Sequence, residues 1–262
     1  MPVEAAAYLF HALLGCGLIV QTLEFLAIDR CQNARQIWAW SVQRRDVLHV
    51  WKWLQNVFDF FFSEKIHRLH LFLRLFCAGS LLWSSTLVCS IFLFASTIVL
   101  LVRWRGGFNG GSDFMTLVAL TALLGAEIIT PFTGEEFAWR AALWYVTLHA
   151  ITSYFVSGAV KILDADWMNG RALIYFLDGG LYGPLSQSSI LRLPGVARIC
   201  SWSFIFWEVS FPFALSGQNI AMMFCGVAAV FHFLVFRFFS LNRFVWAWAA
   251  TFPAVIFCAS QL

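Results

Sequence analysis

Long runs of hydrophobic residues, separated by short polar segments, recur along almost the whole chain. A run of about 17–25 apolar residues is long enough to cross a lipid bilayer as a helix. Eight runs fit this pattern: 5–28, 66–82, 86–104, 113–130, 137–161, 199–215, 219–239 and 243–260. The pattern therefore predicts an all-α, polytopic membrane helix bundle of about eight transmembrane helices, organised as a single domain over residues 1–262.

Two segments do not follow the pattern of a span. In residues 46–63, polar residues at alternating spacings of three and four form one stripe, and apolar residues line another face (His49, Lys52, Asn56, Asp59 and Ser63 against Val47, Trp51, Leu54, Phe58 and Phe61). This pattern predicts an amphipathic helix lying in the membrane interface. Residues 171–198 mix a short apolar stretch with glycines, serines and prolines, and we expect a re-entrant or surface excursion there.

Composition supports the membrane class. Hydrophobic residues make up 61% of the 262 residues and charged residues only 12%. Such a chain is not a soluble domain, and nothing in it indicates a nucleic-acid partner. The seven cysteines follow no metal-binding or disulfide spacing. We therefore expect membrane lipids, and other integral membrane subunits, as the partners of this chain.

The distribution of charge predicts sidedness. With eight spans, both termini lie on one side of the membrane. Of the 17 lysines and arginines, all except Arg140 fall on the opposite side, which also holds Lys161. Because cytoplasmic loops carry an excess of basic residues, the Lys161 face is predicted to be cytoplasmic and the termini non-cytoplasmic.

Charged residues gather where the fifth predicted span ends, at Lys161, Asp164, Asp166 and Trp167. One interpretation is an interfacial stop, in which the lysine reaches the headgroups, the tryptophan anchors there and the aspartates cap a short helix. The other is a catalytic site: a lysine removed from water gives up its proton more readily, as a general base must. Asp113, on the same side, is a further candidate. Ser112 or Asp113 is also placed to cap the start of a helix that ends at about Thr130, before a loop over residues 131–136.

The same stretch resembles the core signature of a membrane protein family. The matching residues are Tyr154, Phe155, Gly158, Lys161, Leu163, Asp164, Asp166, Trp167 and Gly170. In this pattern the chain is similar to the HTTM (horizontally transferred transmembrane) domain family, which is related to the membrane domain of the vitamin K-dependent γ-carboxylases. A second similar region covers residues 231–253, and weaker likeness reaches back to about residue 103.

The resemblance implies a location and a chemistry. In the carboxylases a lysine at this place deprotonates reduced vitamin K, so Lys161 is implied as a base and a quinone or other lipid as its substrate. The bacterial relatives imply a bacterial inner membrane. The carboxylases, however, present the corresponding face to the lumen. Two residues depart from the pattern: Ile162 is an extra residue after the lysine, and Gly110 follows Asn109 where the carboxylases carry a histidine.

Three further ionisable residues, His149, Glu208 and His232, lie well inside predicted spans. Counting about 1.5 Å per residue places them at similar depths. They would suit a proton relay or a site for a metal held by two imidazoles and a carboxylate. Alternatively, each side chain forms a hydrogen bond to a neighbouring helix. Because no HExxH or CxxC motif is present, we assign no metal ligand from the sequence.

Three functions are compatible with these observations. The first is a small membrane-embedded enzyme that uses Lys161 as a base on a quinone or other lipid-like substrate. The second is a non-catalytic integral subunit of a larger membrane complex that binds partner helices, lipids or pigments. The third, a transporter that uses the buried histidines and glutamate, is the least favoured. The sequence does not name a cofactor or a substrate.

Overall fold

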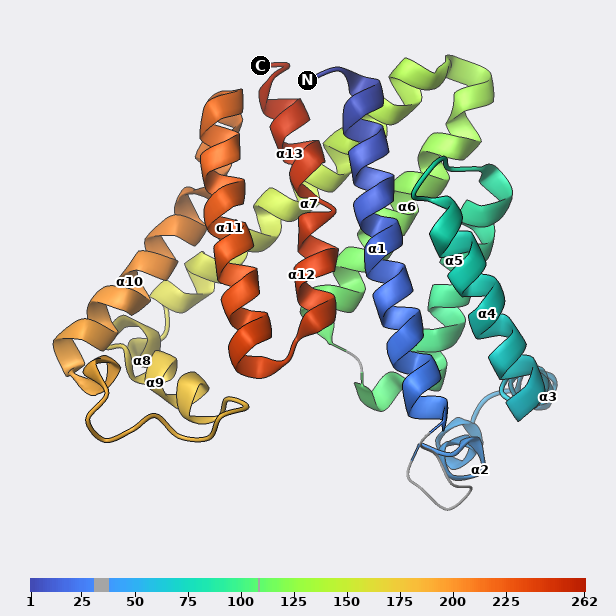
Figure 1. Cartoon of the computed structure of the whole chain (residues 1–262), viewed down its shortest axis with the longest axis horizontal. Coiled ribbons are helices and arrows are strands. Elements are labelled where there is room, and N and C mark those ends of the chain that lie inside the picture. The colour runs from blue at the N-terminus through green and yellow to red at the C-terminus, as the bar shows by residue number, and fades with distance from the viewer. Residues whose placement is uncertain (31–37, 108) are drawn as a thin grey trace. The chain divides into compact units, whose positions relative to one another are not determined.

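The computed structural model describes residues 1–30, 38–107 and 109–262. All regular secondary structure in these residues is helical, which confirms the all-α class (Figure 1). The chain divides into two compact units, and the single domain expected from the sequence stays a prediction. Unit 1 comprises residues 1–10 and 139–262, and unit 2 comprises residues 11–138. Helix α1 (Val3–Arg30) contributes residues to both units.

Four helical segments of the described residues are long and apolar enough to cross a membrane. They are Val3–Asp29, Gly110–Thr133, Pro194–Ser216 and Gln218–Phe239. The predicted membrane class is therefore supported, but the count of about eight spans is not confirmed. The predicted span 66–82 is the 17-residue helix α4 (Glu64–Ser80), and 86–104 is α5 (Leu87–Arg103), also of 17 residues.

In unit 2, α4, α5 and α6 (Gly110–Thr133) pack as consecutive hairpins. Thr86 caps α5 by accepting a hydrogen bond from the Cys89 amide. We expected Ser112 or Asp113 to cap α6, but Asn109 does so, because its side chain accepts from the amides of Gly111 and Ser112. Asp113 supports this cap from within the helix: its Oδ2 accepts from the Asn109 amide at 2.8 Å.

The turn after α6 is tighter than expected. The sequence predicted a loop over residues 131–136, yet α6 includes Pro131 and continues to Thr133. Gly134 alone separates it from α7 (Glu135–Ile162), with φ at +87°. This left-handed region suits glycine, which has no Cβ to clash there.

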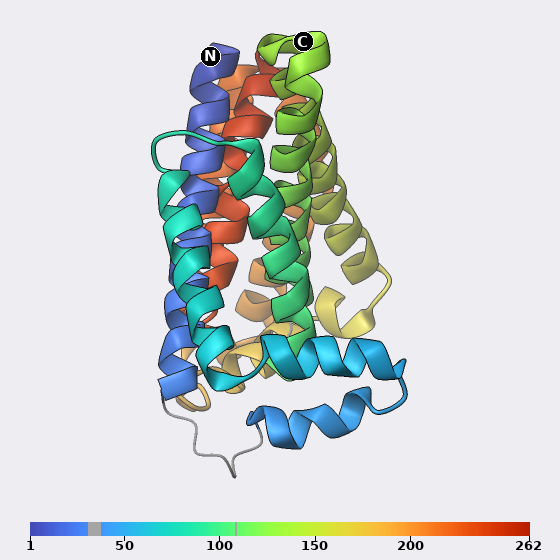
Figure 2. The ribbon, with the colours of Figure 1, turned by 90° about the vertical axis from the view of Figure 1, so that its right-hand side faces the viewer.

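Residues 40–61 form a helical hairpin instead of the single helix predicted over 46–63. Its first arm is α2 (Trp40–Gln43) followed by the 3-10 helix η1 (Arg44–Val47), and its second arm is α3 (Lys52–Phe61). Figure 2 shows both arms, in blue, and α3 contacts α4. That α3 lies in the membrane interface stays a prediction.

One ion pair joins the two arms of the hairpin. The Arg44 guanidinium donates to both carboxylate oxygens of Asp59, with Nε–Oδ1 at 2.7 Å, and Trp40 Nε1 donates to Oδ1 at 2.9 Å. The hydrogen bond from Arg44 lowers the pKa of Asp59. The pair therefore stabilises the folded hairpin while Asp59 is ionised.

Unit 2 also contains two buried arginines that were counted in the prediction of sidedness. Arg74 is fully buried and donates to Gln21, Ser96 and Thr97. Arg103 is 3% exposed and donates to Gln43 at 2.8 Å. These two arginines form hydrogen bonds inside the protein, so they are weaker indicators of sidedness than basic residues in loops. The predicted orientation rests on the remaining basic residues.

Unit 1 contains α7 from Trp139 onward, and α8 to α13. After α7 come the short α8 (Ala165–Met168) and α9 (Arg171–Asp178), and α10 then runs over Pro194–Ser210 and α11 over Gln218–Phe239. The expected excursion over 171–198 thus ends earlier, because α10 already begins at Pro194. Whether this segment lies on the membrane surface stays a prediction.

Proline ends or restarts helices in unit 1, as expected of a residue that cannot donate a backbone hydrogen bond. Pro212 lies in the 3-10 helix η4 (Phe211–Ser216) that follows α10. The predicted span 243–260 is interrupted at residues 250–251, giving α12 (Asn242–Ala249) and α13 (Phe252–Ala259), with Pro253 in the first turn of α13. Figure 1 shows α12 and α13 returning alongside α11.

Candidate functional site

Helix α7 presents the residues of the family-like signature toward α10. Tyr154, Gly158 and Lys161 are spaced by four and three residues and therefore lie on one helix face. At Gly158 the two helices approach closely: a Cβ built there would lie 2.8 Å from Glu208 Cβ and 2.8 Å from the backbone nitrogen of Val209. Only glycine fits without a shift of α10. This approach brings the Lys161 side chain within reach of Glu208.

Lys161 forms a hydrogen-bonded ion pair with Glu208. Its Nζ lies 2.7 Å from Oε1 and 2.6 Å from Oε2 of Glu208, and 2.6 Å from the Ser157 Oγ. The Ser157 hydroxyl in turn donates to Glu208 Oε1 at 3.1 Å. Relative exposure is 16% for the lysine side chain and 5% for the glutamate. The ammonium also lies 5.1 Å from the centre of the Trp167 ring.

This arrangement differs from both interpretations of the sequence. An anchoring lysine would direct its ammonium to headgroups, and the catalytic interpretation expected Asp113, Asp164 or Asp166 beside it. Instead the buried partner is Glu208. An ion pair taken out of water is tolerated only with good geometry and further hydrogen bonds, and Ser157 supplies them here.

The two aspartates after α7 have structural roles. Asp164 is the N-cap of α8, and its Oδ1 accepts from the Asp166 amide at 2.8 Å. Asp166 pairs with Arg171 at 2.5 Å, and both of these side chains are exposed. The capping part of the first interpretation therefore holds for Asp164. Neither carboxylate takes part in the Lys161 ion pair.

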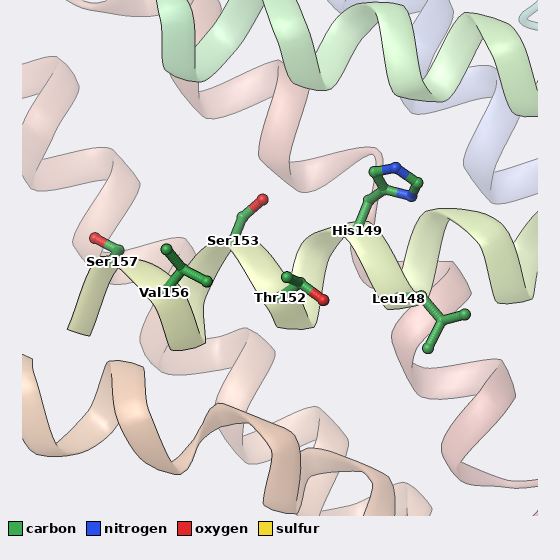
Figure 3. A pocket seen from close by; sticks show the side chains of 6 residues that line it. All are labelled: Leu148, His149, Thr152, Ser153, Val156 and Ser157. Atoms are coloured by element: carbon green, nitrogen blue, oxygen red, sulfur yellow. The ribbon is translucent and has the colours of Figure 1, made fainter. Parts of the chain in front are cut away.

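An open pocket of about 560 Å³ lies along α7. Its lining residues are Leu148, His149, Thr152, Ser153, Val156 and Ser157. Figure 3 shows the side chains of His149, Ser153 and Ser157 projecting from the same side of the helix. Ser157 links the pocket to the ion pair, because it lines the pocket and its hydroxyl forms hydrogen bonds with Lys161 and Glu208. The pocket thus offers apolar surface, polar side chains and one end at a buried charge pair.

His232 lies in an aromatic cluster of unit 1. Its Nε2 is 2.6 Å from the Tyr154 hydroxyl, and its ring stacks on Trp248 with centroids 5.2 Å apart. Tyr154 stacks on Phe211 at 4.0 Å. This is the predicted alternative in which a buried histidine hydrogen-bonds a neighbouring helix.

His149 and Asp113 do not lie where the sequence suggested. His149 was expected to be buried, but it is exposed and hydrogen-bonds the Tyr145 carbonyl of its own helix at 2.9 Å. Asp113 is buried in unit 2, where its Oδ2 accepts from the amide of the cap residue Asn109 and its Oδ1 accepts from Gln21 Nε2 at 3.2 Å. Across the residues that the structure describes, no group of three or more His, Cys, Asp or Glu side chains could hold a metal. The hypothesis of a metal site built from His149, Glu208 and His232 therefore has no support.

The sequence singled out Lys161 and Glu208 but did not join them. Nothing in the spacing of two residues 47 positions apart shows that their helices are neighbours. Ser157 was missed altogether. The available signal was its position four residues before Lys161, which places a hydroxyl beside the ammonium on the same helix face.

Comparisons with protein-family models, with curated proteins and with solved structures found no match. The resemblance to the HTTM family therefore stays a prediction, carried by the residues of the signature. What the geometry itself defines is a helical protein with membrane-compatible helices and a buried, hydrogen-bonded ion pair at the end of an open pocket.

Proposed function

We propose that this chain is an integral membrane enzyme that binds a lipid-like molecule along α7 and takes a proton from it with the Lys161–Glu208 pair. The observation that carries the proposal is the position of Ser157, which lines the pocket and whose hydroxyl forms hydrogen bonds with both members of the pair. The resemblance to the HTTM and γ-carboxylase families favours a quinone in its reduced form, a quinol, as the substrate.

The geometry supports a proton transfer in two steps. In the resting pair the three N–H groups of the Lys161 ammonium face Ser157 Oγ and the two oxygens of Glu208. A proton first passes from Nζ to a Glu208 oxygen, which leaves a neutral amine and a neutral carboxylic acid. The amine then takes the hydroxyl proton of Ser157, whose oxygen takes the hydroxyl proton of the bound quinol in the same step. The products are a quinolate anion, the lysine ammonium and protonated Glu208, so charge and protons balance.

A second function has an observation of its own in its favour. Every N–H of the ammonium already has an acceptor, as expected if the pair only holds α7 against α10. The outward faces of α10 and α11 also expose large apolar side chains, among them Phe206, Met223 and Phe233. Both features suit a non-catalytic subunit that binds lipids or partner helices in a larger complex.

The experiment compares Lys161→Arg with Lys161→Ala in purified, detergent-solubilised protein. A short-chain quinol is added without oxygen, and quinolate formation is followed by absorbance. We expect the wild-type protein to form quinolate and both variants to form none, because a guanidinium does not release its proton at working pH. The free energy of unfolding separates the role of Lys161 as a base from its role as a structural link. Arginine keeps the ion pair, whereas alanine leaves Glu208 buried and unpaired at a cost of about 3–5 kcal/mol.

Two results would contradict the proposed enzyme function. If Lys161→Arg forms as much quinolate as the wild type, the lysine is not the base. If the wild type forms none while Lys161→Ala still unfolds more readily, the pair is a structural link and the subunit function is favoured. A Glu208→Gln variant tests the first step, since an amide does not accept the lysine proton.

A further inference from the structure

The outward face of α10 carries a second open pocket, of about 500 Å³. Its lining residues are Arg198, Ile199, Trp202, Ser203 and Phe206. All of them are exposed, whereas the opposite face of the same helix, with Ala197, Ser201, Ile205 and Glu208, is buried. This second pocket is therefore on the other side of α10 from the Lys161 ion pair.

Arg198 differs from four other cations of unit 1, because each of those four has a partner within the chain. Lys161 pairs with Glu208, Arg171 with Asp166 and Arg192 with Asp178, and the Arg237 guanidinium lies 4.2 Å from the centre of the Tyr182 ring. Within the described residues no carboxylate lies within ion-pair distance of Arg198. Its charge is thus available to an external anion.

The rest of the pocket is apolar and belongs to a helix that can cross a membrane. Ile199 is 69% exposed and Phe206 is 74% exposed, on the segment Pro194–Ser216. Arg198 lies near the start of that segment, where headgroups would lie, and Phe206 lies two turns further along. The polar groups beside them are already used: Trp202 Nε1 donates to the Met168 carbonyl, and Ser203 donates to the Ile199 carbonyl.

We infer that this pocket binds an anionic phospholipid, with the phosphate on Arg198 and an acyl chain along Ile199, Trp202 and Phe206. A single cation at one end of an apolar strip matches a molecule with one negative headgroup and a long hydrocarbon tail. A free phosphate ion would satisfy only the arginine, and a zwitterionic lipid would bring a second, positive charge to it. The inference requires membrane insertion but not the proton transfer proposed for Lys161.

Native mass spectrometry of the detergent-purified protein tests this site. Phosphatidylglycerol and phosphatidylcholine with the same acyl chains are titrated in separate samples. A basic residue near the membrane surface contributes about 1 kcal/mol toward an anionic lipid, so Arg198→Ala should weaken phosphatidylglycerol binding about fivefold. Arg198→Lys, which keeps the charge, should retain most of the affinity. The matched control is Arg171→Ala, which removes an exposed arginine that already has a partner.

Three results would overturn the inference. The first is equal affinity of the wild type for the two lipids. The second is the same loss of phosphatidylglycerol binding in Arg198→Ala and Arg171→Ala. The third is competition by inorganic phosphate at equal concentration, which would show that a free anion suffices. Circular dichroism of each variant confirms that it is folded, which the exposed position of Arg198 leads us to expect.

Discussion

Replacing Gly158 by alanine tests whether the Lys161–Glu208 ion pair depends on the close approach of α7 and α10. The added methyl group would lie 2.8 Å from three atoms of α10: Glu208 Cβ, Val209 Cγ2 and the Val209 backbone nitrogen. Two of these contacts involve atoms at or next to the backbone, which no side-chain rotation relieves. Helix α10 must therefore move away from α7 as a body.

The structure gives the size of the effect. Relaxing the contact from 2.8 Å to the ordinary limit of 3.4 Å needs a shift of about 0.6 Å. The same shift would lengthen the Lys161–Glu208 contact from 2.6 Å to about 3.2 Å, at the limit of a good hydrogen bond. Overpacking of this kind costs about 1–3 kcal/mol. We expect Gly158→Ala to lower thermal stability and to reduce quinolate formation, although Lys161 and Glu208 are both still present.

Gly226→Ala is the matched control, because Gly226 lies inside α11 and a Cβ there meets nothing within 4 Å. Alanine is the better helix former, so this change should be neutral or stabilising by up to about 1 kcal/mol. Both variants are compared by differential scanning fluorimetry in the same detergent. If Gly158→Ala unfolds at the same temperature as Gly226→Ala, the helices do not cross closely at Gly158 and the ion pair does not depend on that crossing.

Two further predictions concern the hairpin of residues 40–61 and the topology. The hydrogen bond from Arg44 lowers the pKa of Asp59, so the pair stabilises the hairpin above the unfolded-state value of about 3.9 and this contribution is lost as the pH falls through the lower folded-state pKa. Hydrogen exchange of residues 52–61, corrected for intrinsic rates, should rise over that acidic range in the wild type and be uniformly fast in Asp59→Asn. An export-dependent reporter fused after Leu262 should be active, whereas an active cytoplasm-only reporter there would contradict the predicted orientation.

The positions of most helices could be predicted from the sequence because their hydrophobic runs are long. The predicted runs 5–28 and 219–239 correspond closely to α1 and α11. Runs near the length limit were less informative: α4 is 17 residues long, and its buried surface includes His67, His70 and Arg74. A helix that buries polar residues against its neighbours has the same low hydropathy as a helix that lies outside the membrane.

Errors at helix ends came from local chemistry that competes with periodicity. Asn109 caps α6 with its side-chain oxygen, a role that Ser112 and Asp113 suit equally well by residue type. Pro131 was expected to end α6, yet the helix includes it and stops only at Gly134, where φ is positive. Residue type indicates several residues that could cap or end a helix, and the tertiary structure determines which of them does so.

The candidate site was predicted only in part because its members come from different helices. Lys161 was identified from its position at the end of a hydrophobic run, and Glu208 from its unusual place within one. Their pairing depends on the crossing of α7 and α10, which no one-dimensional pattern contains. The same holds for Tyr154 and His232, which are 78 positions apart and meet at 2.6 Å.

The signature that suggested a catalytic lysine is explained largely by packing. Gly158 permits the approach of α7 to α10, and Gly170, with φ at +78°, has its Cβ position only 2.5 Å from the Ala197 backbone. Tyr154 stacks within the aromatic cluster, and Asp164 caps a helix. These residues would be required in a subunit without any chemistry, so their presence does not distinguish an enzyme from a scaffold. Lys161 is different, because arginine would preserve its ion pair but not its capacity to lose a proton. Quinolate formation by Lys161→Arg is therefore the measurement on which the assignment of function depends.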